Sequence, residues 1–166
     1  MTEQTKKRHR AGFVNIIGNP NVGKSTLMNA LVGEKLSIVT AKAQTTRHRI
    51  MGIVNGEDYQ IVYSDTPGIL KPNYRLQKSM MNFVDTAIGD ADIILYVTDT
   101  VEKGDKNDEY IAKLQKINCP VILVINKIDI SSQEQVLELM NWWKEQIPNA
   151  IIFPASAQEK FNLDNI

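Results

Sequence analysis

The sequence has a single cysteine, no net charge and no apolar run long enough to cross a bilayer. One cysteine, Cys119, excludes a disulfide within the chain and fits a reducing compartment. The 19 basic and 19 acidic residues give no overall attraction to nucleic acid or to an acidic membrane. No stretch approaches the ~20 apolar residues of a spanning helix, and the amino terminus lacks the apolar segment of a signal peptide. We therefore expect a cytoplasmic protein.

The one strong concentration of charge is a basic cluster at the amino terminus, Lys6-Lys7-Arg8-His9-Arg10. This cluster could contact RNA or acidic lipid at the inner face of the cell membrane, but a solvated, frayed terminus is the favoured interpretation. The remaining composition, 43% hydrophobic and 23% charged, is that of an ordinary globular domain. For 166 residues we expect one domain over 12–166, preceded by a basic tail over 1–11.

An eight-residue stretch, Gly18-Asn19-Pro20-Asn21-Val22-Gly23-Lys24-Ser25, carries the strongest signal in the chain. An apolar run precedes it and a helix-forming segment follows it, as in a phosphate-binding loop with the pattern GxxxxGK[ST]. The loop N–H groups and the helix dipole favour a polyphosphate, Lys24 supplies a cation, and the Ser25 hydroxyl suits magnesium. We expect phosphate contacts from all of the residues between the two glycines and from the start of the helix: Asn19, Pro20, Asn21, Val22, Gly23, Lys24, Ser25 and Thr26.

Short apolar runs alternate with amphipathic segments along the rest of the chain. Asn55-Gly56 predicts a hairpin between two strands, hence one antiparallel pair. The continuous apolar runs are typical of buried parallel strands. Together they predict an α/β fold: a P-loop NTPase three-layer sandwich with a doubly wound, mostly parallel sheet and one antiparallel edge strand. Expected strands are 13–17, 48–54, 59–63, 93–97, 121–125 and 151–153, and expected helices begin near 26, 76, 107 and 133.

Polar motifs follow two of these strands, where ligands bind in such sheets. Asp65-Thr66-Pro67-Gly68 is a common turn by itself, but beside a phosphate loop Asp65 can hold magnesium through a water. Gly68 leaves its N–H free to approach a terminal phosphate. The sequence therefore predicts a magnesium site that combines Asp65 with Ser25.

A second motif, Asn126-Lys127-Ile128-Asp129, predicts which base is bound. The Asp129 carboxylate can accept both the N1–H and the 2-amino group of guanine, and adenine would leave it unpaired. Asn126 braces the loops and the Lys127 stem covers the ring. After the last strand, Ser156 is expected to brace Asp129, and the Ala157 N–H to reach guanine O6.

Taken together, these motifs resemble the GTPase domain of the Era family, bacterial ribosome-assembly GTPases of the P-loop TRAFAC class. The motifs that carry the resemblance are GNPNVGKS, AQTTRHR at 43–49, DTPG, NKID and the Ser-Ala pair at 156–157. The resemblance implies that Thr46 binds magnesium and closes over the terminal phosphate, with Thr45 as the alternative. It also implies a slow, magnesium-dependent GTP hydrolase that acts as a switch through the loop over 34–47 and the segment after Gly68.

One position departs from the Ras-like pattern, in which a glutamine follows the DxxG glycine and orients the attacking water. Here that residue is Ile69, which is usual in the Era-like group but cannot make the hydrogen bond. Asn21 is a candidate potassium ligand near the phosphates, the alternative being a residue that shapes the loop. No arginine identifies itself as a catalytic finger, and Arg47 and Arg49 are expected to be surface charges.

The Era family also carries a KH domain that binds small-subunit ribosomal RNA, and no GxxG loop in a KH setting occurs here. The resemblance thus implies ribosomal RNA and the 30S subunit as partners through that domain, a monomer, and no DNA. Residues 162–166 are expected to form the first turn of an incomplete helix. Three alternatives remain: a P-loop ATPase, a sister Era-like GTPase, and a nucleotide-gated binding module with negligible hydrolysis.

Overall fold

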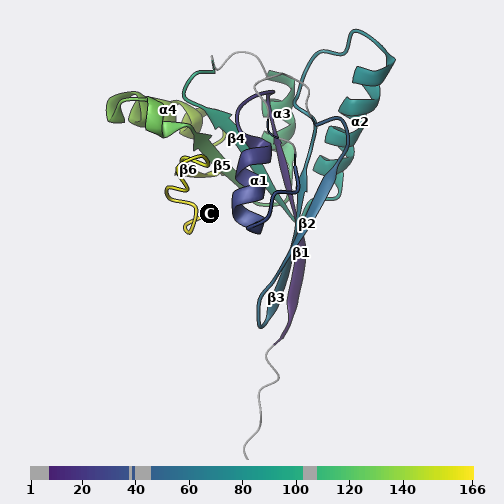
Figure 1. Ribbon diagram of the computed structural model, residues 1–166. Helices are drawn as coiled ribbons and strands as arrows, with labels where there is room; N and C mark the ends of the chain where they lie inside the picture. Colours follow the sequence, from purple (N-terminus) through teal and green to yellow (C-terminus); the bar gives the residue numbers. More distant parts are fainter. Residues whose placement is uncertain (1–7, 38, 40–45, 103–107) are drawn as a thin grey trace, which may run out of the picture.

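The computed structural model describes residues 8–37, 39, 46–102 and 108–166. Thr45 and the first two residues of the basic cluster, Lys6 and Lys7, lie outside these ranges. Strands and helices alternate along the described chain, with one hairpin after the first helix (Figure 1). The elements are β1 (Arg10–Gly18), α1 (Lys24–Val32), β2 (Ile50–Asn55), β3 (Tyr59–Asp65), α2 (Arg75–Gly89), β4 (Ile93–Asp99), α3 (Asp108–Lys116), β5 (Val121–Asn126), the 3-10 turn η1 (Ile128–Ile130), α4 (Gln133–Gln146) and β6 (Ile151–Pro154).

The described strands form one sheet in the order β2-β3-β1-β4-β5-β6. β2 runs antiparallel to β3, and the pairs β1–β3, β1–β4, β4–β5 and β5–β6 are parallel. This confirms the predicted mostly parallel sheet with an antiparallel edge strand. Ile16 pairs with Asp65 and Asp99 with Asn126, so the polar motifs meet at the carboxyl edge of the sheet.

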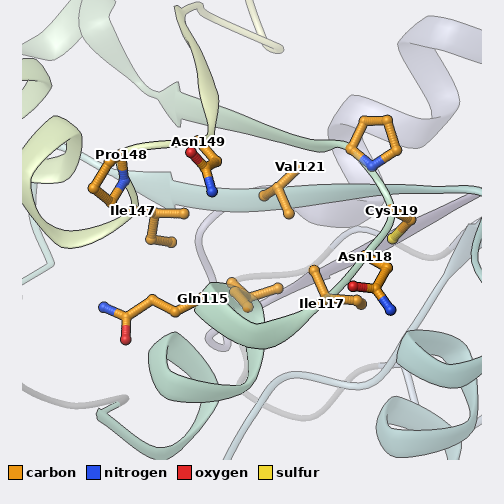
Figure 2. Close-up of a pocket in the computed structure, with 10 residues that line it drawn as sticks. Gln115, Ile117, Asn118, Cys119, Val121, Ile147, Pro148 and Asn149 are labelled. Atoms are coloured by element: carbon orange, nitrogen blue, oxygen red, sulfur yellow. The ribbon is translucent and has the colours of Figure 1, made fainter.

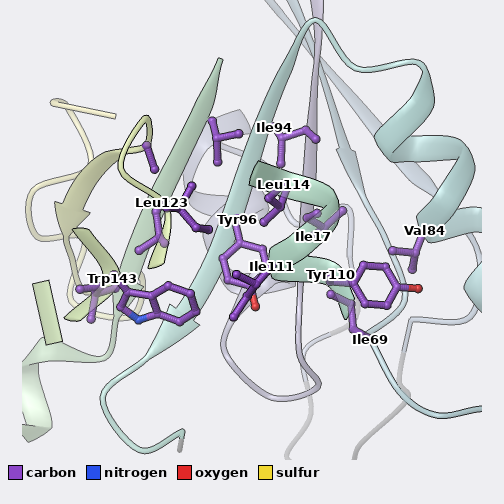
Figure 3. Close-up of a cluster of buried hydrophobic side chains, with 14 of the residues drawn as sticks. Ile17, Ile69, Val84, Ile94, Tyr96, Tyr110, Ile111, Leu114, Leu123 and Trp143 are labelled. Atoms are coloured by element: carbon purple, nitrogen blue, oxygen red, sulfur yellow. The ribbon is translucent and has the colours of Figure 1, made fainter. Parts of the chain in front are cut away.

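Two apolar clusters lie on opposite faces of the sheet. The larger cluster packs α2, α3 and α4 against side chains such as Ile17, Tyr96 and Trp143 (Figure 3). The smaller cluster packs α1 against Ile16 and its neighbours. Strand residues alternate between the clusters because successive side chains point to opposite faces. The result is the expected three-layer arrangement, with both faces of the central strands buried.

Local sequence signals explain where the helices begin and end. Gly33 closes α1 in the left-handed conformation, with φ of 81°, and its N–H donates to the Asn29 carbonyl. Ser132 and Gln135 form a reciprocal capping box at the start of α4. These signals place the end of α1 and the start of α4 at the predicted positions, whereas α1 begins at Lys24, two residues before the expected start.

Three details differ from the expectations or extend them. β1 begins at Arg10, inside the tail expected over 1–11, because the Arg10 N–H pairs with the Asp58 carbonyl at 2.9 Å. Residues 162–166 form a turn closed by one hydrogen bond from the Ile166 N–H to the Leu163 carbonyl, at 3.1 Å. Within the described ranges, no helix has the length and apolar character needed to cross a membrane.

Candidate nucleotide-binding site

Close backbone packing shapes the phosphate loop between β1 and α1. A Cβ on Gly18 would lie 2.2 Å from the Val97 carbonyl oxygen, and one on Gly23 would lie 2.1 Å from Asn126 Nδ2. Gly23 also has φ of 98°, a conformation that favours glycine. α1 begins at the next residue, Lys24, so its free N–H groups open toward the loop. Both glycines are therefore required by the shape of the loop.

Lys24 lies buried at the bottom of this loop, with 6% of its surface exposed. Its Nζ donates to the Asn19 carbonyl at 2.7 Å. Burial lowers the pKa of Lys24 to about 8, although the carboxylates of Asp65 and Glu102 oppose the shift. Burial deprives the Lys24 ammonium group of water and destabilises its charge. A bound phosphate would stabilise that charge in place of the lost water.

The three residues predicted to bind magnesium lie together beside Lys24. The Ser25 hydroxyl donates to Asp65 Oδ2 at 2.6 Å, and Thr46 Oγ1 lies 3.1 Å from Ser25 Oγ and 3.4 Å from Asp65 Oδ2. These residues come from α1, from the segment before β2 and from the end of β3. Two hydroxyls and a carboxylate thus converge on one point.

The second carboxylate oxygen, Asp65 Oδ1, is buried and has no hydrogen-bond partner among the described residues. Burial raises the pKa of Asp65, against the opposing effects of the Ser25 hydroxyl and the Lys24 charge. A buried carboxylate with an unpaired oxygen is under-satisfied, and a hard cation would remove that deficit. The oxygen-only donor set of Ser25, Thr46 and Asp65 fits Mg²⁺, with phosphate and water as the remaining ligands.

Gly68 lies directly against the phosphate loop. A Cβ there would come within 2.7 Å of Pro20 N, and the following N–H, of Ile69, donates to the Gly18 carbonyl at 3.0 Å. The Ile69 side chain is 5% exposed and packs with Met80 and Tyr110 in the larger apolar cluster (Figure 3). The Ile69 side chain is therefore part of the core.

The predicted base-reading residues meet at the end of β5. Ser156 Oγ donates to Asp129 Oδ1 at 2.7 Å, which is the expected brace. Asn126 is 3% exposed, and its Nδ2 donates to the Val22 carbonyl at 2.9 Å. The Ala157 N–H donates to Asn126 Oδ1 at 2.9 Å, so its predicted contact with guanine O6 would require that hydrogen bond to be shared or exchanged.

Lys127 connects this motif to the phosphate loop. Its backbone is left-handed, with φ of 61°, and its Nζ contacts both the Asn21 carbonyl and Asp99 Oδ2, the latter at 2.6 Å. Asp99 lies at the end of β4 and is 4% exposed. Its ion pair with Lys127 Nζ therefore holds the lysine stem in place. Asn21 also has positive φ and is exposed, and its recorded contact is made by the main chain. That geometry agrees with the loop-shaping alternative; the potassium role stays a prediction.

Sequence reasoning missed two polar anchors near the magnesium residues. Asn29 of α1 accepts from the N–H groups of Leu36 and Ser37 and donates to the Ser37 carbonyl, which fastens the start of the loop over 34–47. The expectation that Arg49 is a surface charge is wrong: its side chain is 11% exposed and pairs with Asp90 at 2.6 Å. The Arg49 contact has no local sequence signal, because its partners come from other elements.

A pocket of about 300 Å³ lies away from these residues, at the start of β5 (Figure 2). Its lining comes from the end of α3, the segment before β5 and the loop after α4, including Cys119. Burial raises the pKa of the Cys119 thiol, which favours the neutral packing role expected for this residue. The pocket contains none of the predicted nucleotide ligands.

Sequence comparisons agree with this geometry. Residues 13–127 match the family model described as 50S ribosome-binding GTPase. GTPase Era of Heliobacterium modesticaldum is 43% identical over 95% of this chain and 53% of its own length. GTPase Era of Clostridium botulinum (strain Eklund 17B) is 45% identical over 95% of this chain and 54% of its own length. The chain thus spans about half the length of the curated relatives it matches.

Solved structures show the same relationship. A crystal structure of Era with MgGDPNP and nucleotides 1506–1542 of 16S ribosomal RNA matches with a TM-score of 0.88 at 41% identity, over 95% of this chain and 55% of that one. A variant of Aquifex aeolicus Era bound to GDP·AlF4⁻ matches with a TM-score of 0.86 at 42% identity, over 93% and 54%. From the family match, supported by these similarities to Era, the chain belongs to the family of 50S ribosome-binding GTPases.

Proposed function

We propose that this chain binds GTP with Mg²⁺ and hydrolyses it to GDP and phosphate, as the switch domain of a GTPase that acts in small-subunit ribosome assembly. The observation that carries the proposal is the unpaired, buried Asp65 Oδ1 beside the Ser25 and Thr46 hydroxyls and the Lys24 ammonium group. The Asp65 oxygen that has no hydrogen-bond partner among the described residues would gain a partner in a bound metal triphosphate.

The phosphates bind where the N–H groups at the start of α1 and the Lys24 ammonium group are both available. Magnesium, when bound, would neutralise negative charge that develops on the phosphate oxygens during transfer. Ser25, Thr46 and Asp65 would hold it, while Gly68 N–H would contact the terminal phosphate. Lys24 would stabilise the same charge, so the residues act by position and electrostatics without a covalent intermediate.

Guanine would be selected at the other end of the site. The Ser156 hydroxyl holds the Asp129 carboxylate for the N1–H and 2-amino donors. The Lys127 stem, fixed by Asp99, lies between the base-reading loop and the phosphate loop. Adenine would leave the Asp129 carboxylate unpaired, which supports GTP over ATP as substrate.

The attacking water would lack a side chain of the Ras type, since Ile69 packs in the core. We therefore propose slow intrinsic hydrolysis, with the water positioned by main-chain groups, by the phosphates or by a potassium ion near Asn21. Turnover that is equal in potassium and in sodium would remove the potassium part of this proposal.

Two measurements test the nucleotide chemistry. ATP and GTP compete against labelled GDP at equal concentration; comparable affinities would contradict guanine selection by Asp129. Phosphate release is followed with magnesium in potassium and then in sodium, beside a Lys24→Ala control. Release above the control in either salt supports hydrolysis.

The second candidate function is a nucleotide-gated binding module without significant turnover. The burial of Ile69 favours it, because no catalytic side chain replaces the missing glutamine at that position. Guanine-specific, magnesium-dependent binding without phosphate release above the Lys24→Ala control would support the module.

The proposed partners follow from the relatives. The matched Era structure contains a 16S ribosomal RNA segment, and we propose that RNA contact belongs to the longer protein, through a KH domain. We also propose a cytoplasmic monomer that does not use DNA, with peripheral contact to the inner membrane face as the weaker alternative. Titration of this chain with RNA corresponding to nucleotides 1506–1542 tests the assignment, and tight binding would move the RNA site into this domain.

A further inference from the structure

The segment Thr46-Arg47-His48-Arg49 lies across the end of β3 and carries side-chain contacts on both faces of the sheet. Asp65 pairs with Ile16 and points to the α1 side, whereas Ser64 pairs with Asn15 and points to the α2 side. Thr46 contacts Asp65 on the first side. Arg49 contacts Ser64 on the second, where its Nε donates to Ser64 Oγ at 2.9 Å.

Arg49 is the most strongly bonded residue of this segment. Its two terminal nitrogens reach the Asp90 carboxylate at 2.6 and 3.2 Å, and one of them also lies 3.3 Å from Asn15 Oδ1. Asp90 is the residue that ends α2, and Asn15 Nδ2 in turn donates to Asp90 Oδ1 at 2.6 Å. A forked ion pair with further hydrogen bonds fixes both the position and the orientation of the guanidinium group.

His48 makes a second, independent contact with the same helix. Its ring meets Phe83 edge-on, with centroids 5.8 Å apart and planes at 74°. Two successive residues thus dock onto α2, one by ring packing and one by charge. Thr46, in contrast, has long contacts of 3.1 and 3.4 Å to Ser25 and Asp65. The β2–β3 pairing begins only at Ile50 and does not include Thr46.

We propose that the Arg49–Asp90 pair is a positioning device that holds Thr46 at the magnesium site, and that α2 thereby influences metal and triphosphate binding. This inference rests on the proposed function. Arg49 is a positioning residue: its partners are Asp90, Asn15 and Ser64, and it acts on Thr46 through the two residues between them, Arg47 and His48.

The main test compares Asp90→Asn with Asp85→Asn. Both aspartates belong to the region of α2, and their side chains are 48% and 50% exposed. Asp85 pairs with Lys113 on α3 and does not contact the segment 46–49, so its variant removes an ion pair of α2 without touching the proposed device. Arg49→Lys keeps the charge but loses the fork, and we expect an intermediate result.

Two readouts are measured on the 166-residue chain. The first is amide hydrogen exchange of residues 46–49 without nucleotide, which should become about fivefold faster in Asp90→Asn and unchanged in Asp85→Asn. The second is the magnesium-dependent preference for a non-hydrolysable GTP analogue over GDP, which should fall by about fivefold in Asp90→Asn alone. GDP affinity should stay within about twofold of the wild-type value, because GDP lacks the phosphate that Thr46 faces.

Unchanged exchange in Asp90→Asn would overturn the proposal, as would an equal loss of affinity for both nucleotides, since that indicates a purely structural contact. A wild-type chain without any magnesium-dependent preference would refute the magnesium-dependent switch of the proposed function instead. Even then, the exchange measurement would confirm or reject the anchoring of residues 46–49, because it uses no nucleotide.

Discussion

The two ends of the proposed nucleotide site differ in how far their polar groups are already satisfied. At the base end, Asp129 is held by Ser156, and the Asn126 amide is bonded to Val22 on one side and Ala157 on the other. At the phosphate end, Asp65 Oδ1 has no partner among the described residues, and Lys24 is bonded to the carbonyl of its own loop. The base end is organised without ligand, whereas the phosphate end gains its missing interactions from one.

This difference suits the base end to selecting the nucleotide and the phosphate end to acting as a switch. Side chains that are already held in place by hydrogen bonds discriminate between bases at little reorganisation cost, as selection of guanine requires. Under-satisfied groups respond strongly to the arrival and loss of a charged ligand, as a switch requires. The following predictions test the two ends in turn.

The largest effect is expected at the base end, from Asp129→Asn. The amide should donate to the 2-oxo group of xanthine, so preference should move from guanosine to xanthosine nucleotides, with a loss of GTP affinity on the order of 10³-fold or more. Competition binding against labelled GDP and XDP measures the change. The exposed Asp164→Asn serves as the control. Retained guanine preference would show that Asp129 does not select the base.

A smaller effect, on the free energy of unfolding, is expected from Lys24→Met. This change replaces the buried cation with an apolar side chain of similar length. In the nucleotide-free wild-type chain, the pKa of Lys24 is about 8, below its usual value of 10.5. Between these pH values the unfolded chain binds more protons, so the free energy of unfolding should rise with pH, by about 3 kcal/mol relative to Lys24→Met. Urea unfolding at pH 7.5 to 10.5, in steps of about half a unit, measures this difference. Identical pH profiles would mean that Lys24 is not destabilised by burial.

Ile69→Gln tests whether a glutamine at position 69 is enough to position the attacking water and speed up hydrolysis. Because Ile69 packs with Met80 and Tyr110, the amide would be buried without partners and should destabilise the protein by about 2 kcal/mol. We expect no increase in the rate of phosphate release. The exposed Leu76→Gln is the matched control for adding an amide. Faster hydrolysis in Ile69→Gln would show that residue 69 can turn toward the phosphates.

The smallest effect is expected from removing magnesium. Chelation should weaken GTP binding about tenfold more than GDP binding if, as proposed, a hydroxyl of the loop before β2 contacts the metal only in the triphosphate state. Thr46→Ala should abolish this difference, while Thr45→Ala should leave it intact. Isothermal titration with and without EDTA measures both. The opposite result would assign the role to Thr45.

The sequence predicts the sheet and the motif positions because their signals are local. Apolar runs such as 121–125, the Asn55-Gly56 turn and the glycines of the phosphate loop each act within a few residues. The pairing of Ser156 with Asp129 also follows from their places after adjacent strands. Arg49 could not be found in this way. Its partner, Asp90, becomes a neighbour only after β1, β3 and α2 have assembled.

The order of the strands also sets the distance between the ends of β1 and β5. The phosphate loop follows β1 and the base-reading motif follows β5, with β4 between them. Neighbouring strands lie about 4.8 Å apart, so the ends of β1 and β5 are roughly 10 Å apart, although the loops that follow them meet where Asn126 Nδ2 donates to the Val22 carbonyl at 2.9 Å. A ligand that fills both ends of the proposed site therefore needs a linker between its charged end and its flat ring. In the proposed function, guanine alone or triphosphate alone would meet half of the site, and the ribose would be the spacer that joins the two halves.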